Sequence, residues 1–196
     1  MKNKHLISLA SAAAMSLAAL ASAQAEEATS WYIQGTGGLS LGSLTVEDRA
    51  GDEGSLNDEG FNSRIGVGAY IFHDFRVGVE SGYASFSENS VDVDTWDVLA
   101  VAYYDFKNDT RLTPFVGLGA GLAQQRIKIG NGANAEKETT NHLALKVGAG
   151  VGYEIADNLE LLAEHSFQYH VKAELDNETD VSAYQNQFNV GLRYSF

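Results

Sequence analysis

The sequence predicts an all-β fold, an eight-stranded antiparallel up-and-down transmembrane β-barrel. Composition is the first observation: 20 glycines, nine tyrosines and nine phenylalanines against one proline suit many strands rather than long helices. The second is that eight segments alternate apolar and polar residues with a period of two, as strands between lipid and a polar interior must do. The third is that the polar connections alternate between short and long.

The first three segments lie between Trp31 and Phe86. WYIQGTGGLSL covers residues 31–41, and RVGVESGYASF covers residues 76–86. Between them, residues 61–71 place Phe61, Ile65, Val67, Ala69 and Ile71 on one face, and Asn62, Arg64, Gly66, Gly68 and Tyr70 on the other. Because successive side chains of a strand point to opposite faces, this alternation gives one apolar and one more polar face.

The fourth and fifth segments form the middle of the chain. In residues 95–106 we expect Asp97, Val101, Tyr103 and Asp105 inside the barrel, and Trp96, Val98, Ala100, Tyr104 and Phe106 outside. LTPFVGLGAGLAQ follows as residues 112–124. Both are long enough for a tilted strand to cross a bilayer, which takes about 9–11 residues.

The last three segments repeat the pattern. Residues 141–155 place Leu143, Leu145, Val147, Ala149, Val151, Tyr153 and Ile155 on one face, and His142, Ala144, Lys146, Gly148, Gly150, Gly152 and Glu154 on the other. Glycines on the polar face suit a small barrel, where some inward residues must be small so that long ones can cross the interior. LELLAEHSFQYHV covers residues 159–171. The eighth segment, residues 183–196, ends in the alternating stretch FNVGLRYSF.

The lengths of the connections alternate along the chain between short and long. Tight turns are expected at residues 73–74, 107–109 and 156–158, after the even-numbered segments, and longer polar stretches follow the odd-numbered ones, the longest at residues 42–60. Barrels of the bacterial outer membrane have short periplasmic turns and long outer loops. We therefore expect a cell outer-membrane location with periplasmic N- and C-termini and extracellular long loops.

The N-terminus has the layout of a secretory signal peptide. Two lysines precede an apolar stretch, residues 6–20, and small residues follow, with cleavage expected after residue 23 or residue 25. A retained helix is the alternative. The predicted organisation is a signal peptide, residues 1–23, and a barrel domain, residues 24–196.

Charge and cysteine content narrow the function classes. The net charge is −13, and removal of the signal peptide leaves 11 basic and 26 acidic residues, a net charge of −15. This argues against nucleic-acid binding, because neutralising phosphates needs a basic surface. The chain has no cysteine, so disulfides do not hold this exported protein together. No apolar run near 18 residues follows the signal, so a helical span is not expected.

Three stretches of the chain resemble one known family. They are YYDF at residues 103–106, TPFVGLGAGLA at residues 113–123, and the C-terminal row Phe188, Val190, Leu192, Tyr194 and Phe196. Together they resemble the small outer-membrane β-barrel family of Gram-negative bacteria, which includes OmpX-like, OmpA N-terminal-like and Opa-like surface proteins. The resemblance implies that the C-terminal row is the signal read by the barrel-assembly machinery, by pairing with a strand edge.

Ten charged residues are expected inside the barrel. They are Arg64, Arg76, Glu80, Asp97, Asp105, Lys146, Glu154, Glu160, Glu164 and Arg193. Isolated charges in a narrow interior are costly, so these should pair or contact internal water. Side chains can just fill an eight-stranded barrel, which favours a polar plug over the alternative, a conduit lined by ion pairs.

No catalytic, cofactor or metal site is expected. Glu164, His165 and Ser166 offer an acid, a base and a nucleophile, but adjacent strand residues point to opposite faces. Barrel lipid A deacylases resemble this chain in size, yet Phe167 stands where their serine would be. The glycine-rich stretches lack a nucleotide-binding pattern, and the histidines show no zinc-ligand spacing. The acidic stretch at residues 46–60 is a solvated loop, with a calcium or magnesium site or a docking patch for a basic partner as alternatives.

These observations favour a structural and surface-interaction role in the envelope, as an adhesin or surface antigen. A narrow small-solute porin is the alternative, and a lipid-modifying enzyme is a third hypothesis. The expected partners are outer-membrane lipid and lipopolysaccharide, the barrel-assembly machinery, and an extracellular protein at the loops. We expect a monomer.

Overall fold

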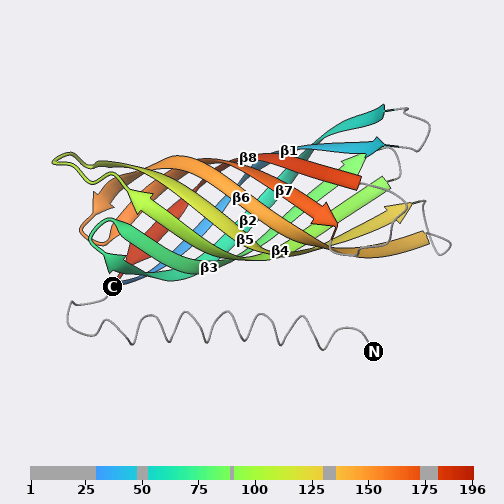
Figure 1. The fold of residues 1–196 in the computed structure, drawn as a ribbon. Coiled ribbons are helices and arrows are strands. Elements are labelled where there is room, and N and C mark those ends of the chain that lie inside the picture. Colours follow the sequence, from blue (N-terminus) through green and yellow to red (C-terminus); the bar gives the residue numbers. More distant parts are fainter. Residues whose placement is uncertain (1–29, 48–52, 89–90, 130–135, 173–180) are drawn as a thin grey trace.

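The structure, a computed structural model, describes residues 30–47, 53–88, 91–129, 136–172 and 181–196. These residues form eight strands: β1 (Trp31–Glu47), β2 (Glu53–Phe72), β3 (Phe75–Glu88), β4 (Val91–Asp105), β5 (Leu112–Ile129), β6 (Glu136–Ala156), β7 (Leu159–Lys172) and β8 (Val181–Ser195). Each strand pairs antiparallel with its neighbours in the chain, and β8 pairs with β1, so the sheet closes into a barrel (Figure 1). The predicted fold is confirmed. The predicted signal peptide lies outside the described residues.

Among the residues that the structure describes, no helix is long and apolar enough to cross a membrane.

The tight turns and the two ends of the described chain lie at one end of the barrel. β2 and β3 are joined through residues 73–74, and β6 and β7 through residues 157–158. In the β4–β5 turn, the side chain of Asn108 accepts a hydrogen bond from the backbone N–H of Thr110 at 2.9 Å. The N–H of Phe196 donates to the carbonyl of Trp31 at 2.8 Å. Both ends of the described chain are thus fixed at the turn end.

At the opposite end, called the loop end below, the strands are longer than the sequence predicts. The sequence predicts a loop over residues 42–60, yet β1 continues to Glu47 and β2 begins at Glu53, paired through Glu47 and Glu53. Residues 48–52 lie outside the described residues. The prediction failed because it depended on an apolar face, and a strand that extends beyond hydrocarbon needs no apolar row.

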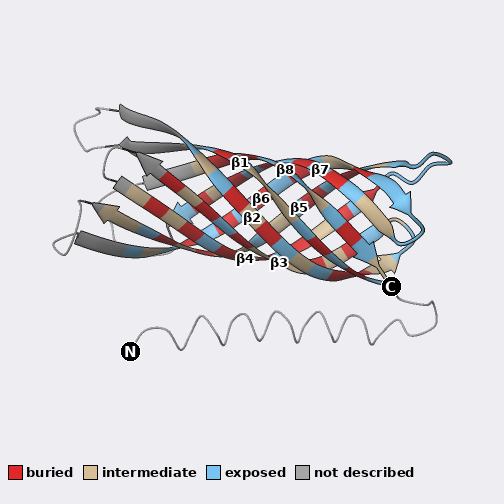
Figure 2. Ribbon diagram, turned by 180° about the vertical axis from the view of Figure 1, so that it is seen from behind, coloured by how far each residue is buried: buried red, intermediate tan, exposed pale blue. Residues whose placement is uncertain are grey.

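Burial alternates along each strand, as Figure 2 shows. In β4, Asp97, Val101, Tyr103 and Asp105 are buried, while Trp96, Ala100 and Tyr104 are exposed, which confirms the predicted faces. Ala69 departs from the pattern, since it belongs to the outward row of β2 yet is 3% exposed. Its methyl group lies in register between the larger Trp31 and Val77.

Candidate functional site

The interior of the barrel near the turn end is filled by an arginine between aromatic rings. Arg76 donates from Nε and Nη2 to the two carboxylate oxygens of Asp105, both at 2.7 Å. Its guanidinium lies 4.6 Å from the ring centroid of Tyr103, 5.2 Å from Tyr32 and 5.4 Å from Phe115. A bidentate pair and cation–π contacts compensate for removing this charge from water.

A second ion pair lies in the same part of the interior, near the turn end. Arg193 on β8 donates to Glu160 on β7, its cross-strand neighbour, and its guanidinium lies 5.9 Å from the ring centroid of Phe115. Arg193 is buried, whereas the Glu160 side chain is 20% exposed. The two arginines therefore approach the same ring from different sides of the barrel.

The middle level is organised around Glu80. One carboxylate oxygen accepts hydrogen bonds from the Gln34 amide at 2.9 Å and the Tyr103 hydroxyl at 2.5 Å. The other lies 3.0 Å from Nζ of Lys146, which also contacts Glu164 at 2.8 Å. These residues come from five strands, β1, β3, β4, β6 and β7. Glu80 thus ties opposite walls of the barrel together.

The next level toward the loop end is an arginine–aspartate clamp. Arg64 donates to both oxygens of Asp97, at 2.8 and 3.0 Å. The Gln168 side chain donates to Asp97 at 3.0 Å and accepts from Arg64 at 3.2 Å. Arg64 also lies 3.7 Å from Glu80. The two levels therefore form one continuous network of buried charges.

Of the ten charged residues predicted inside the barrel, eight are buried, one is half-buried and one is exposed. Arg64, Arg76, Glu80, Asp97, Asp105, Lys146, Glu164 and Arg193 are buried, and Glu160 is half-buried. Glu154 is exposed, which corrects its expected place in the network. The pairing between β6 and β7 shifts register between Glu154 and Ala156. Glu154 itself still pairs in register with Glu160 near the turn end, where inward parity alone does not bury a side chain.

Uncharged polar side chains are the interior residues that the sequence reasoning missed. Gln34, Gln168 and Gln187 are buried, and the first two take part in the charge networks described above. Their inward parity is visible in the sequence, but a glutamine carries no charge that would single it out as an interior contact. Asn62 and Thr95, closer to the loop end, are also buried, and each has side-chain atoms without a hydrogen-bond partner among the described residues.

The histidines fall on both faces. His142 and His170 point inward from adjacent strands, with ring centroids 6.3 Å apart, a proximity that their sequence spacing did not reveal. His165 is exposed on the outer face and packs at 4.5 Å against the Phe188 ring, whereas Ser166 is buried inside. The two therefore point to opposite faces, as predicted. Among the described residues, no group of three or more histidine or acidic side chains could hold a metal ion.

The outer surface carries a belt of large apolar side chains. Those more than half exposed are Leu39, Phe61, Ile65, Phe72, Trp96, Leu118, Phe188, Val190 and Phe196. Toward the loop end the outward rows become polar, from Trp96 to Asp94 on β4 and from Leu143 to Asn141 on β6. A belt of this extent, bounded by polar residues, is the surface that a strand barrel presents to hydrocarbon.

The C-terminal row lies on this belt. Phe188, Val190, Leu192, Tyr194 and Phe196 are between 41% and 67% exposed. The strand that carries them pairs with β7 on one side and β1 on the other. β8 therefore closes the barrel and presents its whole apolar row outward.

Known proteins share both the sequence pattern and the fold. The family model of the outer membrane protein beta-barrel domain matches residues 9–196. Outer membrane protein PagN of Salmonella typhimurium is 29% identical over 111 residues, which cover 48% of this chain and 46% of PagN. The match thus spans about half the length of this curated relative.

Solved barrels are similar across most of the chain. Neisserial surface protein A superposes with a TM-score of 0.58 and 23% identity, covering 87% of this chain and 100% of that chain. Ail, the attachment invasion locus protein of Yersinia pestis, gives a TM-score of 0.49 and 19% identity, covering 83% and 98%. The family match, the closed barrel and the exposed apolar belt agree. The chain belongs to the outer membrane protein beta-barrel domain family and is an integral protein of the Gram-negative outer membrane.

Proposed function

We propose that this protein is a closed structural scaffold of the envelope that presents its long connections outside the cell, as an adhesin or surface antigen. The observation that carries the proposal is the layered ion-pair network. Arg76, Glu80 and Arg64 each make polar contacts across the interior, which suits a filled barrel rather than a channel. Such a scaffold holds the loop ends of the strands at fixed positions for contact with an extracellular protein.

The orientation can be tested with two lysines at opposite ends of β4 and β5. Lys128 lies toward the loop end and Lys107 in the β4–β5 turn. We expect a membrane-impermeant amine reagent to modify Lys128 but not Lys107 on intact cells, and to modify both after the outer membrane is permeabilised. Peptide mass spectrometry reads both sites in one sample. Labelling of Lys107 alone on intact cells would contradict the proposed orientation and place the turn end outside the cell.

A narrow porin is the second candidate. The observation in its favour is that, in the part of the chain that the structure describes, the interior near the loop end is polar but carries fewer ion pairs, with Asn62, Thr95 and the two inward histidines there. Conductance in planar bilayers separates the two functions. We expect no discrete, stable openings from the plugged scaffold, whereas such openings would support the porin.

We propose no catalytic role for the outer face. His165 and Ser166 lie on opposite faces of β7, so a base cannot reach a neighbouring nucleophile. Overproduction of the protein should leave the lipid A of the host unchanged in a mass spectrum, and any new modification would contradict this.

We further propose that the C-terminal row acts as the assembly signal. Its support is the outward apolar row of β8 and the position of this strand as the last to close the sheet. Phe196→Asp should lower the fraction of barrel with heat-modifiable gel mobility in outer-membrane preparations. Ser195→Asp is the matched control, because Ser195 belongs to the other row. Equal losses in both variants would contradict a role specific to the apolar row.

A further inference from the structure

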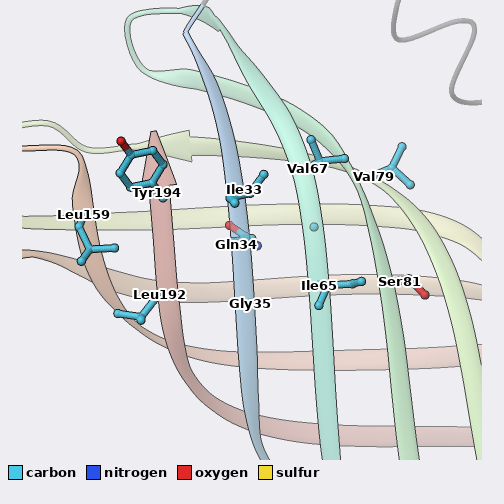
Figure 3. Close-up of a pocket in the computed structure, with 11 residues that line it drawn as sticks. Ile33, Gln34, Gly35, Ile65, Val67, Val79, Ser81, Leu159, Leu192 and Tyr194 are labelled. Atoms are coloured by element: carbon cyan, nitrogen blue, oxygen red, sulfur yellow. The ribbon is translucent and has the colours of Figure 1, made fainter. Parts of the chain in front are cut away.

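We propose that a groove on the lipid-facing surface, across β7, β8, β1, β2 and β3, binds one acyl chain of an outer-leaflet lipid, lipopolysaccharide. The groove has a volume of about 670 Å³ and is centred on Gly35 (Figure 3). The choice of the outer leaflet rests on the orientation proposed above, in which the loop end lies outside the cell. The groove itself does not depend on that orientation.

Two neighbouring cross-strand rows form the walls of this groove, here called the Gly35 groove. One row runs from Leu159 through Tyr194, Ile33 and Val67 to Val79. The other runs from Leu192 through Gly35 and Ile65 to Ser81. In Figure 3, Ile33 stands above Gly35 on the same strand, and Ile65 stands beside Gly35 on the neighbouring strand. The groove is therefore one side chain wide and runs across the strands.

Gly35 is the reason for the groove. It belongs to the outward row of β1, and a Cβ atom built on it would meet nothing within 4 Å. A glycine inside a strand weakens it and removes a packing side chain, so such a residue often marks a place where a ligand or another backbone approaches closely. Here the backbone of β1 is left open on the side that faces hydrocarbon.

The dimensions and direction of the groove suit an acyl chain. Five strands spaced by about 4.8 Å give a length of about 19 Å, comparable to an extended long-chain acyl group. Its lower end is Leu159, the first residue of β7 after the turn, and its upper end is Ser81, well along β3. Because the strands are tilted by about 40°, the groove climbs obliquely from the turn end toward the loop end.

The upper end lies beside residues of the kind that flank a membrane interface. Ser81 accepts a hydrogen bond from Nε1 of Trp96 at 2.8 Å, and Tyr83 donates to Asp94 at 2.7 Å. Trp and Tyr side chains with satisfied polar ends are enriched at membrane–water interfaces. A chain that enters from the leaflet at the loop end passes these rings and continues down to Gly35.

The chemistry of the lining selects lipid over a protein partner. The outward side chains along the groove carry no charge, and the Ser81 hydroxyl is already engaged with Trp96. The surface is continuous with the apolar belt that contacts the membrane. A second barrel that packs its backbone against the open strand at Gly35 is the competing occupant, and the test below separates a dimer from a bound lipid.

The test is native mass spectrometry of the mature barrel, extracted in mild detergent from the outer membrane of its Gram-negative host. Gly35→Leu fills the groove without a clash, since its Cβ site is open. Gly37→Leu is the matched control, because Gly37 is the next outward residue of β1, lies outside the lining, and its Cβ contacts would be no shorter than 3.6 Å. Urea titration of both variants verifies that folding is retained.

We expect wild type and Gly37→Leu to retain one lipopolysaccharide adduct that Gly35→Leu retains about tenfold less, equivalent to about 1.4 kcal/mol of binding. Equal adducts in all three proteins would overturn the proposal. So would a glycerophospholipid adduct in place of lipopolysaccharide, or a dimer that Gly35→Leu abolishes. If lysine labelling shows the opposite orientation, a phospholipid adduct that Gly35→Leu loses overturns the assignment to lipopolysaccharide and the proposed orientation, but not the presence of a lipid site at Gly35. Conductance measurements bear on the scaffold function and not on this result.

Discussion

Replacing Glu80 with alanine is expected to lower the free energy of unfolding by about 3 to 5 kcal/mol, the loss typical when one partner of a buried ion pair is removed. Glu80 is 1% exposed and contacts Lys146 at 3.0 Å and Tyr103 at 2.5 Å. Without this carboxylate, the charge of Lys146 depends on Glu164 alone among the described acidic side chains that contact it. Urea unfolding of the barrel refolded into lipid vesicles measures the change.

Lys128→Ala provides the control for Glu80→Ala. Lys128 pairs with Asp92 at 3.2 Å, but both side chains are about 40% exposed, so this substitution should cost about 0 to 1 kcal/mol. A triple variant, Glu80→Gln with Lys146→Met and Glu164→Gln, should be more stable than Glu80→Ala because it removes all three connected charges. If Glu80→Ala costs no more than Lys128→Ala, the central network does not hold the barrel together.

Val147→Arg is expected to destabilise the barrel by about 2 to 4 kcal/mol, the cost of an arginine on the lipid face near the bilayer midplane. Val147 is 50% exposed and lies in register between Leu118 and Phe167, in the middle of the apolar belt. The same urea titration in vesicles measures the loss. Val147→Leu, which keeps an apolar contact with lipid, should stay close to wild type. A cost for Val147→Arg no larger than that of Val147→Leu would contradict the assigned face.

Gly148 is a less neutral position than the sequence alone suggests. The inward row tolerates polar residues, and from the sequence a small polar side chain at Gly148 should matter less than a charge at Val147. In the structure, however, a Cβ on Gly148 would lie 2.9 Å from a carboxylate oxygen of Glu164, which itself contacts Lys146. Gly148→Ser therefore requires the end of the Glu164 side chain to shift, so Val147→Leu is the cleaner control for Val147→Arg.

The period-two pattern was sufficient to predict the strands, their faces and the tight turns, because hydrocarbon imposes one apolar row on every segment. Trp96 and Asp97 illustrate this, since the outward and inward positions of β4 follow from parity alone. The period-two alternation is expected only where one face of a strand contacts hydrocarbon. The extension of β1 to Glu47 and of β2 from Glu53 could not be predicted, because a strand in water on both sides carries no apolar signature.

The pairing inside the barrel was also beyond the sequence. Parity gives the inward set, but the partners depend on how far each strand is staggered around the barrel. Arg64 meets Asp97 and Gln168 across the interior, a combination that no sequence spacing encodes. Glu154 shows the opposite failure, because this residue of inward parity near the end of β6 is exposed rather than buried.

The most direct test is electron paramagnetic resonance of a nitroxide label, attached in turn to two residues of the same outward row of β6. The chain has no cysteine, so Val147→Cys and Asn141→Cys each give a single attachment site. In vesicles, we expect the label at Val147 to collide with oxygen and to be shielded from a water-soluble nickel complex, whereas the nickel complex should reach the label at Asn141. A label at Val147 that is as accessible to the nickel complex as the label at Asn141 would contradict the assignment of this row to lipid.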